Sequence, residues 1–283
     1  MESPKLSYCM QQTRKFDNDR FLCNLFAPAA EREALSALCA FNLELAHIRE
    51  AVREPLLGHM RLRWWSETLD GVWDGRAPRH GVAEALGLAV RDFGLERRHL
   101  DRMLEARALD LDDRAPASMA VLVEYAEATS GALAEAGLQI LGVGAGDAET
   151  AAAAREVGTA WALIGLVRAV PFHARSRRLY LPADLNREAG LDAFRMFDRR
   201  VTDGVAAVCE RVVCVALQHL ARARARRAAV PTRALPVLLP ATMADRYVAR
   251  LRRAGWDPFA AAVQRPSPLR LLAPAMGRLR LRY

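Results

Sequence analysis

The sequence predicts an all-α protein made of a single soluble domain. Apolar residues recur at spacings of three and four over most of the 283 residues, which is the repeat of a helix with one buried face. No segment alternates apolar and polar residues as a strand would, and glycine and proline stand between the periodic segments. Hydrophobic residues make up 52% of the chain, which is enough for a large core.

The expected helices follow one another with short connections. They cover residues 28–55, 56–73, 82–93, 97–111, 118–141, 151–170, 201–228 and 235–254. The sequence contains no internal repeat and no low-complexity linker. We therefore expect residues 1–264 to form one helical domain.

The first of these helices is expected to run from Pro28 to Pro55. Proline fits the first turn of a helix, and Glu31 and Glu33 place negative charge near its positive end. Pro55 is expected to end the helix, because proline has no amide hydrogen to continue the hydrogen-bond pattern.

The second helix is expected to turn Met60, Trp64, Leu69 and Trp73 toward the core. Neighbouring residues point to different sides of a helix, so Trp64 and Trp65 cannot both be buried there. One of the two should therefore lie at an edge or an interface.

The ends of two later helices are marked by capping residues. Ser118 is the expected N-cap of a helix that reaches Leu141, and the glycines of residues 142–146 end it. Asp147 is expected to cap the next helix, which continues until Pro171.

The chain carries a formal charge of +8, almost all of its cations being arginine, with Lys5 and Lys15 the only lysines. A basic surface favours anionic lipid, phosphate or nucleic acid, although preference for arginine across a whole chain is commonly a general composition bias. No nucleic-acid-binding module is recognisable, so no nucleic-acid partner is expected.

The five cysteines form no CxxC pair and have no histidine at the spacing of a zinc site. They are expected to be buried thiols in a reducing compartment. Residues 1–15 lack the apolar core of a signal peptide, and the longest uncharged stretch, 157–167, is shorter than the roughly 20 residues of a membrane span. We expect a cytoplasmic protein that can still lie on a membrane surface.

Residues 265–283 form a basic, leucine-rich C-terminal tail. Its arginines are Arg265, Arg270, Arg278, Arg280 and Arg282, and it contains no acid. The tail is expected to pack its leucines on the core with the arginines in water. The alternative is contact with anionic lipid or with a partner.

An acidic run, Leu109–Asp113, closes the helix at 97–111. Its acids Asp110, Asp112 and Asp113 are expected to form a solvated face. Asp110 and Asp113 could share one side of a helix, but no second acidic cluster answers them.

Five collinear segments carry a further signal: LSALCAFNLELAHIRE (35–50), MRLRWWSETLDGVWDG (60–75), YAEATSGALAEAGLQIL (125–141), VGTAWALIGLVRAVPFHARSRRLYLP (157–182), and residues 220–247, which contain LPVLLPATM. In this order and spacing they resemble the family of squalene and phytoene synthases. The resemblance implies an isoprenoid-synthase-like helical bundle around a central cavity. It also implies two facing helices, each with acids four residues apart that hold Mg²⁺ against a diphosphate.

At the first of these acidic motifs the sequence departs from the family. The alignment places Ala46, His47, Arg49 and Glu50 there, and only Glu50 is acidic. A single carboxylate could hold Mg²⁺ only weakly, because the ion needs several oxygen ligands.

The second motif departs further. Arg168, Ala169 and His173 stand at the corresponding positions, and Pro171 interrupts the helix where ligands should project. Residues 157–183 contain no acid at all, so the conclusion does not depend on the alignment register. We predict no catalytic residue and no metal site, and therefore no cofactor.

Polar residues around the second motif allow other uses. Arg168, Arg175, Arg178 and Tyr180 could bind a phosphate, although arginines at a helix end also suit the helix dipole. His47 and His173 could face each other and bind a transition metal or transfer a proton. Two histidines without a third ligand are more often satisfied polar contacts.

Within the family, the resemblance is strongest to the branch of the mitochondrial complex I assembly factor 6 and its bacterial relatives. The matching residues are Tyr8-Cys9, Arg14-Lys15, 19–25, 40–46, Met60-Arg61, 125–127 and 166–173, the last with proline and histidine in place of the acids. This implies a non-catalytic scaffold or assembly factor of respiratory complex I type, with a respiratory complex subunit or assembly intermediate as its protein partner.

Two alternatives stay open. One is a divergent prenyltransferase that condenses prenyl diphosphates and needs Mg²⁺; the other is a carrier that holds an isoprenoid or another lipid in the cavity. In each case the expected location is the cytoplasm, with peripheral contact on the inner membrane as a further possibility.

Overall fold

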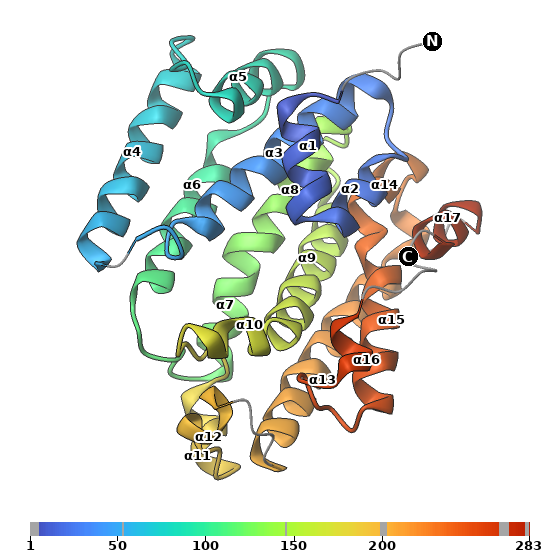
Figure 1. Ribbon diagram of the computed structural model, residues 1–283. Helices are drawn as coiled ribbons and strands as arrows, with labels where there is room; N and C mark the ends of the chain where they lie inside the picture. Colours follow the sequence, from blue (N-terminus) through green and yellow to red (C-terminus); the bar gives the residue numbers. More distant parts are fainter. Residues whose placement is uncertain (1–5, 53, 145, 199–202, 266–271, 281–282) are drawn as a thin grey trace.

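The computed structural model describes residues 6–52, 54–144, 146–198, 203–265, 272–280 and 283. Within these ranges the chain forms helices and no strand, so the all-α prediction is confirmed (Figure 1). The long helices lie side by side in a bundle, with the shorter ones at its ends and edges.

The helices are labelled in chain order. They are α1 (Tyr8–Phe16), α2 (Asn18–Asn24), α3 (Ala29–His47), α4 (Pro55–Trp73), α5 (Gly81–Phe93), α6 (Arg97–Ala106), α7 (Met119–Ala126), α8 (Ala132–Ile140), α9 (Ala148–Arg168), α10 (Val170–Arg175), α11 (Ala183–Glu188), α12 (Ala193–Phe197), α13 (Asp203–Ala225), α14 (Leu235–Leu238), α15 (Pro240–Arg253), α16 (Ala261–Gln264) and α17 (Leu272–Leu279). The 3-10 turns are η1 (Arg107–Leu111), η3 (Arg227–Ala229) and η4 (Thr232–Ala234), and η2 (Glu127–Gly131) is a π turn.

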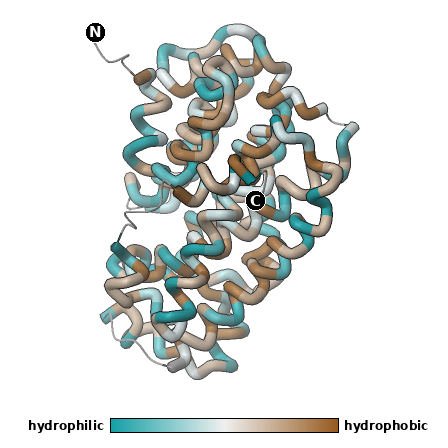
Figure 2. Tube along the Cα trace, turned by 90° about the vertical axis from the view of Figure 1, so that its right-hand side faces the viewer, coloured by the Kyte–Doolittle hydropathy of each residue, from teal (hydrophilic) through white to brown (hydrophobic). Residues whose placement is uncertain are grey.

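Helix α9 lies at the centre of the bundle. It packs against α13, η2, α8 and α15, while α3 packs against α1, α5 and α8. Each long helix carries both hydrophobic and hydrophilic residues, as expected for helices with one buried face (Figure 2). The cavity described below lies between the carboxyl-terminal parts of α3 and α9.

The predicted caps are confirmed. The Ser118 side chain accepts a hydrogen bond from the amide of Val121 at the start of α7. The Asp147 carboxylate accepts one from the amide of Thr150, 2.9 Å away, at the start of α9. In each case a side-chain oxygen satisfies an amide that the helix leaves without a partner.

The predicted end of the helix at 28–55 was wrong. Helix α3 ends at His47, and Pro55 is the first residue of α4. Pro28 is the N-cap residue of α3 and lies just outside its first turn. Both prolines therefore mark helix starts, where the missing amide hydrogen costs nothing.

The inner side predicted for α4 was wrong in part. Met60 and Trp64 are 61% and 43% exposed, whereas Trp65 and Leu69 are buried. Gly58 lies on the buried side of α4 and packs closely on η1: a Cβ there would lie 2.3 Å from a methyl carbon of Leu111. As expected for adjacent tryptophans, one is inside and the other at the edge.

The helix predicted over 118–141 contains the π turn η2 between α7 and α8. Its neighbour across the interface is Gly158 of α9: a Cβ there would lie 2.3 Å from the carbonyl oxygen of Ser130. Such a close backbone approach is open only to glycine. Gly158 thereby lets the widened turn lie directly on α9.

By length and composition, one helix in the described ranges, Gly204–Ala225 within α13, could cross a membrane. Half of the apolar 18-residue stretch within this helix is buried in the bundle, and α13 packs along α9. Four cysteines are buried as predicted, but Cys214 of α13 is exposed. The helical repeat turns Cys214 outward while it buries Cys209 against the core.

The described part of the C-terminal tail folds back onto the bundle. Helix α17 packs on α15, and the buried Tyr283 hydroxyl donates a hydrogen bond to the carbonyl of Ala223. The leucines do not pack as predicted: Leu272 and Leu279 are exposed, and the contacts of α17 are made by small residues such as Ala273. Leu269, Leu271 and Leu281 lie outside the described residues, and the boundary at 264/265 stays a prediction.

Candidate functional site

A cavity of about 500 Å³ opens between α3, α9 and α10, with contributions from η1 and η2. Its size is within the range of small-molecule sites in proteins. The polar lining residues are Arg20, Asn42, Arg49, Glu50, Arg107, Asp110, Tyr125, Thr129, Ser130, His173, Ser176, Arg178 and Tyr180. Apolar side chains in the wall include Phe16, Ala46, Trp161, Ala169 and Phe172.

Asp110 is the centre of the polar wall. Its carboxylate accepts hydrogen bonds from the hydroxyls of Tyr125 at 2.8 Å and Tyr180 at 2.9 Å, and from the Arg107 guanidinium at 3.0 Å. The Arg178 guanidinium donates to the backbone carbonyl of Asp110. Four donors from η1, α7 and the segment after α10 thus hold one residue.

The placement of Asp110 corrects the interpretation of the acidic run. Asp112 and Asp113 are exposed as expected, but Asp110 is only 4% exposed. The 3-10 turn η1 directs it inward, where the neighbouring Arg107 compensates its charge. Burial, with the Asp110 carboxylate adding to it, raises the pKa of Tyr125 and keeps that hydroxyl protonated as a donor.

Three of the four residues at the first motif line the cavity. Ala46 forms part of the wall at the end of α3, and Arg49 and Glu50 follow in the turn. Arg49 donates to the Val52 carbonyl at 3.1 Å and to the Asp113 carboxylate at 2.8 Å. The Arg49 charge is thus partly compensated at the rim, and Glu50 is exposed beside it.

The second motif is divided between the cavity and the contact of α9 with α15 and α2. Ala169 and His173 line the cavity, at the end of α9 and in α10. Arg168 does not: its guanidinium lies 3.3 Å from the Tyr247 ring centroid and 3.9 Å from the Asp19 carboxylate. Arg168 therefore connects α9 with α15 and α2.

The four candidate phosphate-binding residues do not lie together. Arg178 and Tyr180 line the cavity. Arg175 lines a separate open groove beside Phe172 and Phe259, and Arg168 stacks on its tyrosine. Two of the four are therefore placed for a ligand in the cavity.

The two histidines have separate environments. His173 lies on Tyr180, with ring centroids 4.5 Å apart, and burial lowers the pKa of His173 to about 4, so the ring is neutral at pH 7. His47 packs on Phe16 at 5.3 Å and is not part of the cavity wall. Each ring has a contact of its own, as expected for histidines without a shared ligand.

Arg20 of α2 is a wall residue that the sequence did not suggest. Its guanidinium donates to the Asp17 carboxylate at 2.7 Å and to the Ser130 hydroxyl at 2.5 Å. Beyond Arg20, Ser130 and Trp161, a second void holds only about 40 Å³ between the apolar side chains of α3, α8 and α9. That volume takes a water molecule or so.

The charges of the cavity wall are unequal. Four arginines (Arg20, Arg49, Arg107, Arg178) and two carboxylates (Glu50, Asp110) line it, and Asp17 and Asp113 outside the lining pair with Arg20 and Arg49. In the part of the chain that the structure describes, no three His, Cys, Asp or Glu side chains are grouped as metal ligands. Guanidinium donors thus outnumber carboxylates among the residues that line the cavity.

The sequence profile of the squalene/phytoene synthase family matches residues 13–272. The chain belongs to this family. The fold agrees: a dehydrosqualene synthase, solved in complex with a ligand, superposes with a TM-score of 0.81 at 18% sequence identity, covering 97% of this chain and 95% of that one.

Two curated relatives differ in their sequence identity with this chain and in how much of it they cover. The complex I assembly factor 6 of Bos taurus is 33% identical over 98% of this chain and 82% of its own length. The presqualene diphosphate synthase of Rhodopseudomonas palustris is 27% identical, over 69% of each chain. The similarity to the assembly factor thus extends over nearly the whole of this member of the squalene/phytoene synthase family.

Among the wall residues of this family member that sequence reasoning missed are Arg20, Arg107, Asp110 and Tyr125. They come from α2, η1 and α7, which the fold brings together. The usable signal was the spacing of Arg107 and Asp110, since an ion pair three residues apart can form within one turn. No local signal indicates that this pair faces a cavity.

Proposed function

We propose that this chain is a non-catalytic squalene/phytoene-synthase-like protein that acts in the assembly of respiratory complex I. Its protein partner would be a subunit of that complex or an assembly intermediate. Support comes from the similarity to assembly factor 6, which extends over 98% of the chain, and from the cavity wall. The observation that carries the proposal is the lining of the cavity, where arginines outnumber carboxylates at the place at which the family resemblance implies Mg²⁺.

The side chains that face the cavity do not fit Mg²⁺. The ion takes oxygen ligands and requires carboxylates or phosphates to balance its charge. Asp110 accepts hydrogen bonds from two tyrosines and Arg107, which leaves Glu50 as the one wall carboxylate without a hydrogen-bond donor among the described residues. Arg49 next to Glu50 would also repel a cation. We infer that ionisation of a prenyl diphosphate is not supported here.

A carrier of isoprenoids or other lipids is the second candidate. The 500 Å³ cavity and its arginines favour retention of a small anionic ligand. Against a long prenyl tail stands the small volume of the void behind Trp161, about 40 Å³; the hydrogen-bonded pair Arg20 and Ser130 lines both the void and the cavity. The assembly proposal does not require a ligand in the cavity.

The variant Glu50→Gln distinguishes a role in complex I assembly from prenyltransferase activity. In a host that lacks the chromosomal copy, the variant is expected to restore the amount of assembled complex I on native gels as fully as the wild type. Purified wild type with farnesyl or geranylgeranyl diphosphate, Mg²⁺ and NADPH should release no diphosphate above a heat-inactivated control. Mg²⁺-dependent release that Glu50→Gln abolishes would establish the prenyltransferase instead, and normal complex I without the chain would refute the assembly role.

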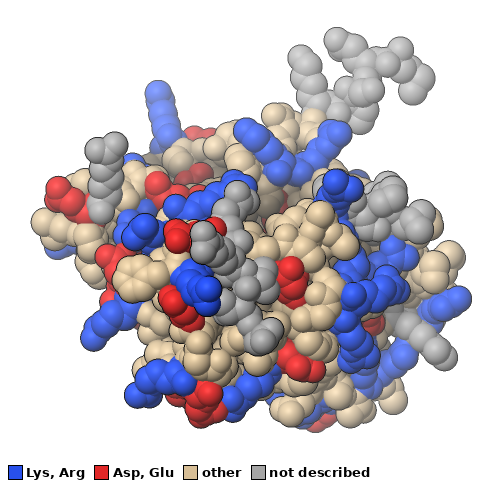
Figure 3. All heavy atoms as spheres, turned by 60° about the horizontal axis from the view of Figure 1, so that its bottom comes forward, with Lys and Arg blue, Asp and Glu red and all other residues tan. Residues whose placement is uncertain are grey.

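We also propose a cytoplasmic location with peripheral contact on the inner membrane. Helix α17 exposes Leu272, Met276 and Leu279 along one side, at spacings of four and three. Arginines gather on the neighbouring surface, over the C-terminal helices on the right of Figure 3. Apolar side chains beside cations are the combination that binds an anionic lipid surface.

Vesicle flotation tests this contact. Vesicles with about one third anionic lipid should carry the protein upward at low salt, and Met276→Asp/Leu279→Asp should reduce the floated fraction at least about fivefold. Leu88→Asp on α5, also an exposed leucine, is the matched control and should float like wild type. Equal flotation of both variants, or no flotation of the wild type, would contradict peripheral attachment through α17.

A further inference from the structure

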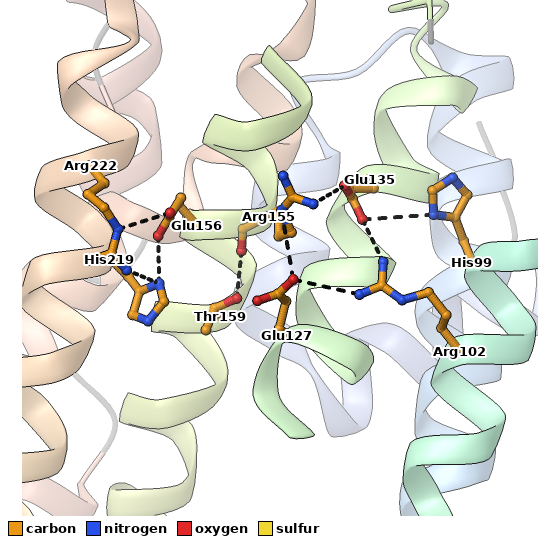
Figure 4. A network of polar contacts seen from close by, with 9 residues as sticks. All are labelled: His99, Arg102, Glu127, Glu135, Arg155, Glu156, Thr159, His219 and Arg222. Atoms are coloured by element: carbon orange, nitrogen blue, oxygen red, sulfur yellow. Dashed lines mark hydrogen bonds and ion pairs between the residues drawn. The ribbon is translucent and has the colours of Figure 1, made fainter. Parts of the chain in front are cut away.

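A second hollow, an open groove, borders the cavity at α7, where Tyr125 lines both. Its volume is about 1030 Å³, and its walls come from α6 and η1, from α7 and η2, and from α13. In the close view of Figure 4, α6 lies at one edge and α13 at the other, with η2 and α9 between them. Such a channel between helices has the shape that receives another helix.

The groove offers apolar contacts that the bundle does not use. Leu109, Val121, Val123 and Val215 are half-buried and line it, together with small alanines of α6 and α7. Half-buried branched side chains next to alanines leave room for the side chains of a partner. The stretch of α7 and η2 along the groove, residues 120–128, is about 13 Å long, or roughly two and a half helical turns.

An ionic network crosses the helices beside the groove (Figure 4). Arg102 lies 3.2 Å from Glu135 and 3.7 Å from Glu127, and Arg155 lies within 4 Å of the same two acids. On α13, His219 and Arg222 contact Glu156 at 2.5 and 3.0 Å. Three arginines thus face three glutamates (Glu127, Glu135 and Glu156), so the network is balanced.

Two acids of the groove remain outside this balance. Glu105 at the end of α6 and Glu124 on α7 line the groove and are exposed. Neither has an ion pair with the residues that the structure describes. With the network neutral, they give the groove a charge of −2 on a chain whose net charge is +8. A local acidic surface on a basic protein favours a basic partner.

We propose that this groove binds an amphipathic, basic α-helix of a protein partner. The partner's apolar side would lie on Val121, Val123 and Val215, and its lysines or arginines would pair with Glu105 and Glu124. Anionic lipid is disfavoured by the same two carboxylates, and an extended peptide would find no sheet edge in the described residues. The inference rests on the proposed assembly function, for which it names the docking surface.

Site-specific crosslinking with the full chain tests the proposal. A photoreactive phenylalanine analogue at the exposed, groove-lining Ala120 should crosslink, in host cells, to one partner segment that the same analogue at Leu88 on α5 does not reach. The crosslinked segment should be a predicted helix with lysine or arginine beside an apolar stripe. A synthetic peptide of that segment is then the binding probe.

Charge reversal supplies the quantitative test. The peptide should bind Glu105→Arg/Glu124→Arg about tenfold more weakly than wild type, because two exposed pairs are lost and repulsion replaces them. Glu33→Arg/Glu84→Arg, which changes the net charge equally on α3 and α5, should bind like wild type at 150 mM salt.

Several outcomes would overturn the groove assignment. They are the absence of a crosslink from Ala120, a crosslink to a second copy of the chain, an acidic or non-helical segment, and equal affinity of the two double variants. Failure of the groove and failure of the assembly role are separable. If complex I is lost without the chain but Glu105→Arg/Glu124→Arg restores it fully, the assembly role stands and the groove is not its docking surface.

Discussion

Asp110→Asn is expected to lower the free energy of unfolding by about 3–5 kcal/mol, because it leaves the buried Arg107 cation without its counter-charge. An asparagine keeps the shape of the side chain, but if its oxygen stays with the Tyr125 and Tyr180 hydroxyls, its amide hydrogens point at the Arg107 guanidinium, which can only donate. Urea unfolding followed by circular dichroism measures the loss.

Two further variants test whether the loss of stability comes from the unpaired buried charge. Asp112→Asn, two residues away on the exposed surface, should give no measurable change. Asp110→Asn/Arg107→Met removes both charges and should recover at least about half of the loss, since unpaired buried charge is the main cost. A single variant within about 1 kcal/mol of wild type would mean that the buried pair contributes little.

Gly158→Ala is expected to destabilise the protein by about 3 kcal/mol, although alanine is the better helix former. The new Cβ would lie 2.3 Å from the Ser130 carbonyl oxygen and 2.9 Å from the Gly131 Cα, and backbone atoms cannot rotate away as a side chain can. Helix α9 and η2 would therefore have to separate, which loosens the wall at Ser130.

Gly165→Ala is the matched control because it lies two turns later on the same helix. A Cβ at Gly165 meets nothing within 4 Å, so alanine should stabilise the protein by about 0.5–1 kcal/mol through the backbone alone. Thermal unfolding of the two variants should move in opposite directions. Equal or higher stability of Gly158→Ala would refute the close contact between η2 and α9.

Helical periodicity predicted the long helices because each buries one side. Helices α5, α9 and α15 lie close to the expected ranges. The short helices α1 and α2 were missed, since two turns give too few repeats to measure a period. The face of α4 was misjudged because the close contact of Gly58 with Leu111 belongs to the tertiary structure.

The family resemblance predicted which end of the bundle to examine. Ala46, Glu50 and His173 do line the cavity there. The polar centre at Asp110 could not be found in the same way, because its partners are separated by up to 70 residues in sequence. Sequence spacing reports neighbours on one helix, and a wall built from η1, α7 and the segment after α10 has no such spacing.

Because four cysteines are buried, alkylation of their thiols can measure local unfolding of the bundle. Burial raises the pKa of Cys9 and Cys39 to about 12 and also raises that of Cys23 and Cys209, so none of these thiols reacts in the closed bundle. Cys214 is exposed and should be alkylated at once. Each slower modification then requires a local opening that exposes one buried thiol. Its rate gives the free energy of local unfolding in that part of the bundle, without an introduced label.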